Sequence, residues 1–257
     1  MAEIVTPEPD AQRRAASQVS LVIPALNEAQ ALSSALRAAL NLEPPALELI
    51  LVDGGSTDGT VTLAEEAGVR VLHAARGRAL QMNLGAQVAR GGILCFLHAD
   101  TRLPRDAVAV MRHSLADPEV AAAGFTSLME GPEGVRWVTS FHNFIKTYYA
   151  PLLFRPVAFF RRHLRLLFGD QAIFCRREDF ESVGGYQEVP IMEEATLCER
   201  LGQRGRILQL SRTVRSSDRR VRRWGFWRAH ATYLLVGFAW GLGISGRRLR
   251  RLYPDVR

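Results

Sequence analysis

"VSLVIPALNEAQALSSALRAAL" (residues 19–40) contains the two elements whose repetition decides the fold. Its first eight residues are apolar and rich in β-branched side chains, which predicts a buried strand. Asn27 then stands as a helix N-cap with Glu28 in the first turn, and apolar residues recur at helical spacing at Leu32, Ala35, Leu36, Ala39 and Leu40. A buried strand that runs directly into a helix is the repeating unit of an α/β sheet.

The same unit recurs twice and is followed by a fourth strand. Further apolar runs are "ELILVD" (48–53), "VRVLHA" (69–74) and "ILCFLH" (93–98), and the segments 61–68 and 77–91 between them are predicted helices. We therefore expect an α/β fold with a mostly parallel central sheet and helices on both faces. Ligands of such sheets bind beyond the carboxyl ends of the strands, where Asn27, Asp53 and Asp100 fall.

Composition narrows the class of ligand. The 257 residues carry a formal net charge of +7, and Lys146 is the only lysine among 33 basic residues. Arginines crowd the last third of the chain, which suits a phosphorylated ligand, an acidic membrane surface or nucleic acid. Three separated cysteines predict no disulfide framework and fit a reducing compartment.

The two ends of the chain differ from its middle. Residues 1–18 are polar, without the apolar centre of a signal peptide, and we expect a disordered leader. "YLLVGFAWGLGIS" (233–245) is shorter than the roughly 20 residues that span a bilayer, so a buried helix is favoured over an interfacial one. In the second half, residues 120–128, 171–177 and 206–210 read as strands, and residues 135–154 as a helix as far as Pro151.

Each motif has a structural and a functional interpretation. In "LVDGGSTDGT" (51–60), Asp53 could accept hydrogen bonds from a base or sugar, but a plain turn with a cap at Thr57 or Asp58 also fits. In "FLHAD" (96–100), Asp100 could be a carboxylate ligand for the Mg²⁺ or Mn²⁺ that accompanies a nucleoside diphosphate, or only a turn residue.

Three further motifs lie in the second half. Glu193 and Glu194 open a helix, where they complement its dipole or supply a general base. Gly169, Asp170 and Gln171 could contact sugar hydroxyls or form a tight turn. Two tryptophans interleave with arginines in "SSDRRVRRWGFWR" (216–228), a pattern typical of nucleic-acid binding or of a loop that closes over a diphosphate.

Taken in order, these motifs resemble the family 2 glycosyltransferases of GT-A fold over residues 19–253. The series runs Pro-x-x-Asn-Glu, V-D-G-G-S-T-D-G-T, G-R-A-x-Q-M-N-x-G, F-L-H-A-D-T, G-D-Q and M-E-E. More narrowly it resembles a bacterial subgroup labelled arsenosugar-biosynthesis-associated glycosyltransferases. The resemblance implies a catalytic domain over 19–225, with a nucleotide half (19–104) and an acceptor half (105–225), followed by an Arg-rich helical segment (226–257).

The resemblance also implies roles. Asp53 would contact the nucleobase, and the nucleotide pocket would be lined by Pro24, Ala25, Asn27, Glu28, Gly55, Arg78, Asn83, His98 and Ala99. Asp100 would hold Mg²⁺ or Mn²⁺, and Gly169, Asp170 and Gln171 would face sugar and acceptor. Glu194, or Glu193 beside it, would be the base of an inverting transfer. The departing diphosphate would meet Arg219, Arg220, Arg222 and Arg223.

Two positions depart from the family pattern: His98 replaces an aspartate, and Glu194 replaces an aspartate with a side chain one methylene longer. The implied donor is a UDP- or GDP-linked sugar and the acceptor a small molecule or lipid. No nucleic-acid partner is expected, and the location is cytoplasmic, with peripheral contact to the inner face of the membrane through the C-terminal segment. One alternative is a nucleotide-sugar- or RNA-binding module of the same fold without catalysis. The other is a sugar-nucleotide pyrophosphorylase, which "PALNEAQA" (24–31) disfavours because it lacks a Gly-rich loop.

Overall fold

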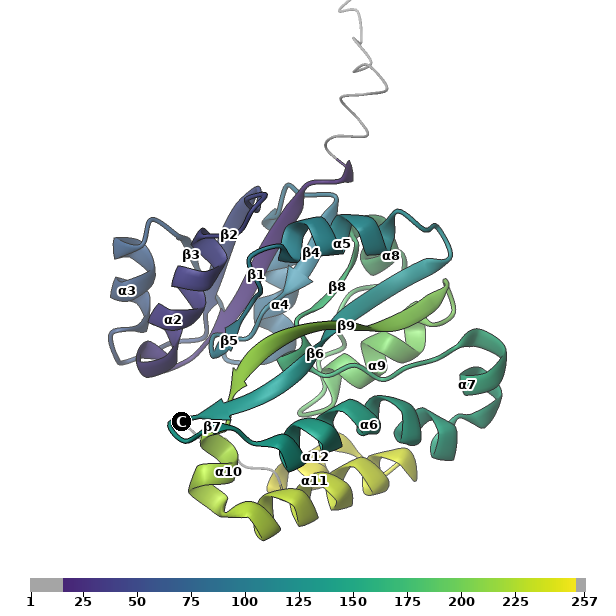
Figure 1. Ribbon diagram of the computed structural model, residues 1–257. Coiled ribbons are helices and arrows are strands. Elements are labelled where there is room, and N and C mark those ends of the chain that lie inside the picture. Colours follow the sequence, from purple (N-terminus) through teal and green to yellow (C-terminus); the bar gives the residue numbers. More distant parts are fainter. Residues whose placement is uncertain (1–15, 253–257) are drawn as a thin grey trace, which may run out of the picture.

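The computed structural model of the chain describes residues 16–252, so residues 1–15 of the expected leader lie outside it. The first half alternates strand and helix as predicted (Figure 1). Its elements are β1 (Val19–Ala25), α2 (Ala29–Leu40), β2 (Glu48–Asp53), α3 (Thr60–Glu66), β3 (Arg70–His73), α4 (Arg78–Val88) and β4 (Ile93–Phe96).

The second half is less regular. It contains β5 (Thr101–Arg102), α5 (Ala107–Leu115), β6 (Val120–Gly131), β7 (Gly134–Val135), α6 (Trp137–Phe154), α7 (Pro156–Arg162), the 3₁₀ turn η1 (Gly169–Gln171), β8 (Ile173–Arg176) and α8 (Arg177–Ser182). These are followed by α9 (Glu193–Leu201), β9 (Arg206–Ser217), α10 (Arg219–Trp224), α11 (Phe226–Gly241) and α12 (Gly246–Leu252).

One mixed sheet joins the two halves in the order β3-β2-β1-β4-β8-β6-β9-β5, with β7 paired to β6. The strands β3, β2, β1 and β4 are parallel, whereas β8 runs antiparallel to both β4 and β6. The parallel pairing of β6 with β9 is the longest, so most paired positions of the sheet are parallel. This confirms the predicted α/β architecture and brings the carboxyl ends of β1, β2 and β4 to one edge.

Helices cover both faces of the sheet, as the alternation of buried side chains within β1 requires. Leu21 and Ile23 pack with α2, α3 and α5 on one face, and Val22 packs with α4, α8 and α9 on the other. A strand buried on both faces is the arrangement that a continuous apolar run predicts. Gly85 of α4 lies against Val22 so closely that a Cβ at this position would overlap the valine side chain.

Two local expectations were wrong. Asn27 does not cap α2: its backbone is left-handed, with φ 54°, and Glu28 is the capping residue without a side-chain hydrogen bond. The helix α6 does not end at Pro151 but continues to Phe154. Proline deprives the carbonyl four residues earlier of its helical donor. Here the backbone N–H of Leu166 donates to that carbonyl, on Thr147, at 3.3 Å, which offsets the loss.

The C-terminal helices pack against the second half. In Figure 1, α6, α11 and α12 lie together on one side of the molecule, away from α2, α3 and α5. Ile191, Val236, Ala239 and Leu249 form a small core of their own that joins α11 and α12 to the loop before α9. The domain boundary at residue 225 stays a prediction. None of the helices in residues 16–252 has the length and apolar character needed to cross a membrane.

Replacing Gly85 with Ala should destabilise the fold, and the same change at Gly237 should stabilise it. Alanine is favoured over glycine in a helix by about 1 kcal/mol, and a Cβ at Gly237 in α11 meets no atom within 4 Å. At Gly85 the overlap with Val22 should outweigh that gain and cost a net 1–3 kcal/mol, about 2–10 °C in Tm. Thermal unfolding measures the Tm of each variant. Equal Tm shifts for Gly85→Ala and Gly237→Ala would contradict the packing of α4 on β1.

Candidate functional site

One cleft of about 540 Å³ lies at the carboxyl ends of the parallel strands. Its walls come from the ends of β1 and β4, the start of α4, the turn η1, the start of α9, and helices α6, α10 and α11. The fold thus brings residues from both halves of the chain together. The predicted site residues that line the cleft are Pro24, Ala25, Glu28, Arg78, His98, Ala99, Asp100, Gly169, Asp170, Glu193, Glu194, Arg219 and Arg220.

The turn after β2 is held by its own polar side chains. The carboxylate of Asp53 accepts hydrogen bonds from the backbone N–H groups of Gly55, at 2.9 Å, and Ser56, at 3.0 Å. Gly55 has φ +92°, a conformation that glycine adopts without strain. Asn27 accepts a hydrogen bond from the N–H of Thr57 at 2.8 Å. Asp53, Gly55 and Asn27 therefore shape the loop beside the cleft and do not line it.

Arg219 joins the two halves of the cleft. Its guanidinium donates two hydrogen bonds to the carboxylate of Glu28, at 2.5 and 2.7 Å, and lies 3.2 Å from a carboxylate oxygen of Asp100. Burial lowers the pKa of Arg219, but Glu28 and Asp100 outweigh that effect and leave it raised. The charged form of Arg219 is therefore stabilised between two acids that follow β1 and β4.

Glu193 and Glu194 form a second charged group at the start of α9, and both are almost fully buried. A terminal nitrogen of Arg78 donates to Oε1 of Glu193 at 2.9 Å and of Glu194 at 3.3 Å, and Nε2 of His98 lies 3.6 Å from Oε1 of Glu194. Burial raises the pKa of Glu194, but His98 and Arg78 outweigh it and hold that pKa at about 2. Burial and the neighbouring Glu194 raise the pKa of Glu193.

Gly169 is the residue that permits this contact. A Cβ on Gly169 would overlap the ring of His98 and would lie 2.7 Å from Oε1 of Glu194. Glycine at this position therefore lets the backbone of η1 approach the carboxylate and the imidazole closely.

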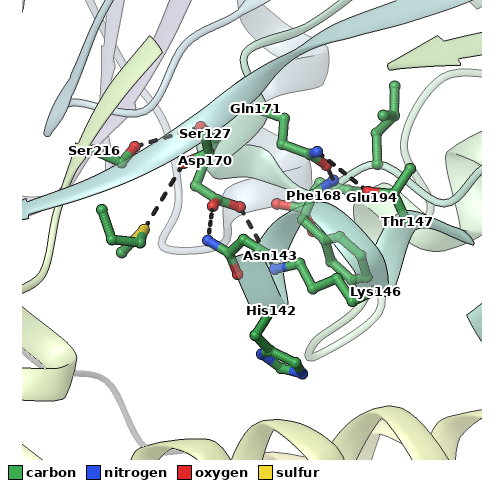
Figure 2. Close-up of polar contacts among 12 residues, drawn as sticks. Ser127, His142, Asn143, Lys146, Thr147, Phe168, Asp170, Gln171, Glu194 and Ser216 are labelled. Atoms are coloured by element: carbon green, nitrogen blue, oxygen red, sulfur yellow. Dashed lines mark hydrogen bonds and ion pairs between the residues drawn. The ribbon is translucent and has the colours of Figure 1, made fainter. Parts of the chain in front are cut away.

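Asp170 points towards Asn143 and Lys146 of α6 (Figure 2). Its carboxylate accepts a hydrogen bond from Asn143 at 2.6 Å, and its other oxygen lies 3.8 Å from the ammonium of Lys146. Lys146 also lies over the ring of Phe168, 4.1 Å from its centroid. Burial lowers the pKa of Lys146, against the opposing effect of Asp170 and Glu194. This side of the cleft thus holds one desolvated cation.

Besides Asn27, Asp53 and Gly55, four further predicted site residues do not line the cleft. Gln171 is fully buried, where its amide accepts from the N–H of Phe168 at 2.8 Å and donates to the Thr147 hydroxyl at 3.2 Å. Asn83 forms two hydrogen bonds with the backbone of Tyr186. Arg222 is bound to Asp218 at 2.7 Å, and neither it nor Arg223 lines the cleft. Gln171 and Asn83 therefore bind neighbouring backbone or side-chain groups, and Arg222 pairs with a neighbouring carboxylate.

Sequence reasoning missed Gln81 of α4 and the contribution of α6. Gln81 of α4 donates to the carbonyls of Ala25 and Val52, each at 2.7 Å, and so ties the ends of β1 and β2 together. Asn143, Lys146 and Tyr149 line the cleft from α6. The only signal for this face was polar: a single lysine and an asparagine within an aromatic helix.

Asp100 suits a divalent cation that is shared with a ligand. Among the described residues no group of three His, Cys, Asp or Glu side chains is arranged to hold a metal by itself. Mg²⁺ in nucleotide sites needs only one or two carboxylates, because phosphate oxygens and water complete its shell. Asp100 lines the cleft at the end of β4 and offers hard oxygen ligands, so the donor set fits that arrangement.

Comparison with known proteins decides the family. The sequence profile described as Glycosyl transferase family 2 matches residues 20–183. The chain belongs to this family. A PGL/p-HBAD biosynthesis glycosyltransferase of Mycobacterium bovis (strain BCG / Pasteur 1173P2) is 31% identical to this family 2 chain over 180 residues, which are 67% of the chain and 64% of that protein. The chain spans 39% to 64% of the length of the first curated relatives that it matches.

Solved structures share the fold of this family 2 chain. The mannosyltransferase PcManGT of Pyrobaculum calidifontis, solved with GDP-Man and Mn²⁺, superposes with a TM-score of 0.64 at 22% identity, over 88% of this chain and 64% of that one. Glucosyl-3-phosphoglycerate synthase of Mycobacterium tuberculosis, solved with Mn²⁺ and UDP-Glc, gives a TM-score of 0.60 at 22% identity, over 93% and 85%. The fold is therefore that of the GT-A glycosyltransferases.

Arg78→Gln should destabilise the chain most at neutral pH. In the native chain the lowered pKa of Glu194 stabilises the fold above the ordinary glutamate value of 4.5, and this stability is lost as pH falls towards about 2. Without Arg78 the pKa values of both glutamates rise, so ionisation at pH 7 opposes folding. Because the Arg78 side chain is 41% exposed, solvent screens part of the effect. We expect a cost of about 1–2 kcal/mol, or 2–8 °C in Tm.

The measurement is Tm as a function of pH between 7 and 5, with Arg37→Gln on the exposed side of α2 as the matched control. The deficit of Arg78→Gln should shrink as pH falls, while that of the control should stay constant. A deficit that grows on acidification would mean that Arg78 does not compensate the two glutamates.

Proposed function

We propose that the chain transfers a sugar from a nucleoside-diphosphate donor to a hydroxyl acceptor, with inversion at the anomeric carbon. The observation that carries the proposal is the arrangement within one cleft. Asp100 and Arg219 lie together at the ends of the parallel strands, and the buried carboxylates of Glu193 and Glu194 lie in the same cleft beside η1. In parallel α/β sheets this edge is where nucleotide ligands bind.

The donor side is built from the strand ends. Pro24, Ala25 and Ala99 would form its walls, and the loop shaped by Asp53, Gly55 and Asn27 would flank the base. Arg219 and Arg220, the two C-terminal arginines of the predicted set that reach the cleft, would bind the diphosphate. Asp100 would hold Mg²⁺ or Mn²⁺, which neutralises charge on the leaving diphosphate when it is bound. The structural relatives solved with GDP-Man and with UDP-Glc support a nucleotide-sugar donor of either base.

The acceptor side contains the proton acceptor. Glu194 is ionised at neutral pH because its pKa is held at about 2, so it can take the acceptor's hydroxyl proton, although it is a weak base. Glu193 has a raised pKa and is the stronger base of the pair. The released hydroxyl oxygen would attack the anomeric carbon from the side opposite the diphosphate. Lys146, Asn143 and Asp170 would orient the acceptor from α6 and η1.

Membership of the arsenosugar-biosynthesis-associated subgroup and the nature of the acceptor belong to this proposal. The Mycobacterium relative is named for PGL/p-HBAD biosynthesis, and that name describes the relative and not this chain. Because the acceptor is unidentified, the reaction is best followed as donor hydrolysis, in which water replaces the acceptor and free nucleoside diphosphate is released. A chain that binds donor and releases none would instead be a nucleotide-sugar-binding module.

Asp100→Asn should remove the metal dependence of nucleotide binding. Replacing a carboxylate ligand by a neutral amide should weaken Mn²⁺-supported UDP or GDP binding by more than about 100-fold, beyond the loss typical of an outer-shell change. Calorimetric titration with and without Mn²⁺ measures this, and Asp106→Asn, at the N-terminus of α5 and paired with Arg212, is the control. Unchanged Mn²⁺-dependent affinity in Asp100→Asn would refute the assignment.

Glu194→Gln should leave donor binding within about threefold of the native value and slow donor hydrolysis by about 10²–10⁴, the usual effect of losing a general base. Glu199→Gln on the same helix, whose carboxylate pairs with Arg155 at 2.8 Å, should change neither. If Glu193→Gln alone stops turnover, the base is Glu193. If both glutamine variants turn over normally, the proposed chemistry is wrong.

A further inference from the structure

Exposed large apolar side chains gather on α6, α7, α11 and α12, which is unusual for a protein surface. Among the described residues every exposed large apolar side chain except Leu40 lies on these helices or between them. They are Trp137, Val138, Phe141, Phe144, Leu152, Leu153, Val157, Phe160, Trp227, Leu234, Leu235, Phe238, Leu242, Ile244 and Leu252. We call this set the apolar face. Exposed apolar side chains that gather in one region mark a site of contact with another surface.

The helix α6 is oriented opposite to an ordinary surface helix. Its buried positions are mostly small or polar, namely Thr139, Ser140, Asn143, Thr147, Ala150 and Pro151. Trp137 and Phe141 on its outer side are 69% and 63% exposed. A helix on a water-facing surface turns its apolar stripe inward. The reversed pattern in α6 indicates that its outer side meets an apolar medium.

The neighbouring helices repeat this pattern. The helix α7 has no buried residue, and only Ala229, Val236 and Ala239 are buried in the 16 residues of α11. Trp227 at the start of α11 is 83% exposed. Since no helix of residues 16–252 could cross a membrane, these helices can lie on an apolar surface but not pass through it.

Charge selects the surface. Residues 134–165 and 219–252, which include these four helices, contain fourteen arginines and Lys146 but no aspartate or glutamate. Some of these arginines are bound to acids from other segments, such as Arg155 to Glu199. Others, including Arg161 and Arg162 of α7 and Arg247, Arg248 and Arg251 of α12, are exposed. Basic residues beside exposed tryptophan, phenylalanine and leucine are the pattern of a helix bound to anionic lipid.

We propose that the apolar face docks on the surface of a bilayer that contains anionic lipids. A second copy of the chain is disfavoured, because two such faces would bring like charges together. RNA is disfavoured because leucine, valine and isoleucine make up more than half of the face, and they cannot stack on bases as aromatic rings do. The bilayer accepts both the aliphatic side chains and the arginines.

The docking also bears on the acceptor, in a step that rests on the proposed function. The opposite sides of α6 and α11 line the cleft through Asn143, Lys146, Tyr149, Tyr233 and Trp240. The bilayer would therefore lie one helix diameter from the acceptor side, so the acceptor hydroxyl is carried by a lipid or a molecule held at the lipid–water interface.

The test is co-sedimentation of the full chain with vesicles of phosphatidylcholine alone or with about a third phosphatidylglycerol, without nucleotide. Native protein should bind the anionic vesicles, more strongly at about 0.1 M than at about 1 M NaCl. The double variant Trp137→Glu, Trp227→Glu should bind at least about ten-fold more weakly. Leu40→Glu, which changes the exposed leucine of α2, should bind like the native chain.

A second pair of variants isolates the charge. Arg161→Glu with Arg162→Glu should weaken binding to anionic vesicles about ten-fold or more, while Arg37→Glu on α2 should not. Asp100→Asn and Glu194→Gln should bind vesicles normally, so failure of the catalytic proposal and failure of this one are distinguishable. Absence of vesicle binding, equal losses in Leu40→Glu, or light scattering that shows a dimer dissociated by the tryptophan variant would overturn the proposal.

Discussion

Five carboxylates line one cleft, and basic side chains compensate them: Asp170 lies beside Lys146, and the other four share two arginines. Glu28 and Asp100 share Arg219, and Glu193 and Glu194 share Arg78. Each arginine comes from a segment distant in sequence from at least one of its partners: 191 residues separate Arg219 from Glu28, and 115 separate Arg78 from Glu193. A buried carboxylate without a partner would take up a proton or unfold its surroundings. The charge requirement therefore couples the first half of the chain to the second half.

The C-terminal helices serve the cleft through one side only. Tyr233, Val236 and Trp240 of α11 close it, and α6 contributes polar groups from positions that an ordinary helix would fill with leucine. The exposed aromatic side chains of α6 follow from this arrangement. The inward side of α6 lines a polar cleft, so its aromatic and aliphatic side chains cannot be buried there and lie on the outer side. The polar wall of the cleft and the α6 part of the apolar face thus both follow from how polar and apolar residues are distributed around helix 137–154.

The first half of the fold could be predicted because local signals there agree with the tertiary structure. The apolar runs 19–26, 48–53 and 93–98 contain mostly buried strands, whose ends at Ala25, Asp53 and Phe96 lie within two residues of the predicted ends. The run 69–74 contains the partly exposed edge strand β3. The second half was less accessible, because its organisation depends on pairings that no local pattern encodes. The antiparallel position of β8 and the passage of α6 through Pro151 are examples. Asp53 and Asn27 were correctly located at strand ends. Their side chains, however, accept hydrogen bonds from the turn's own backbone, and residue spacing does not reveal whether a side chain binds its loop or a ligand.

Under the proposed function, the position of Arg219 would determine how readily the cleft accepts a diphosphate. A guanidinium has five N–H donors in a planar fork, and Arg219 uses its two terminal nitrogens on Glu28 and Asp100. Phosphate oxygens in the cleft would compete for those donors. The side chain is 30% exposed, so the exchange of partners takes place next to water, which can solvate Glu28 as the guanidinium leaves it. An arginine held by two carboxylates at the strand ends is therefore already charged and close to where a diphosphate would lie, and it needs only a change of partner. Folding has already desolvated this cation. A fixed charge that needs no further desolvation contributes most to stabilising a leaving group.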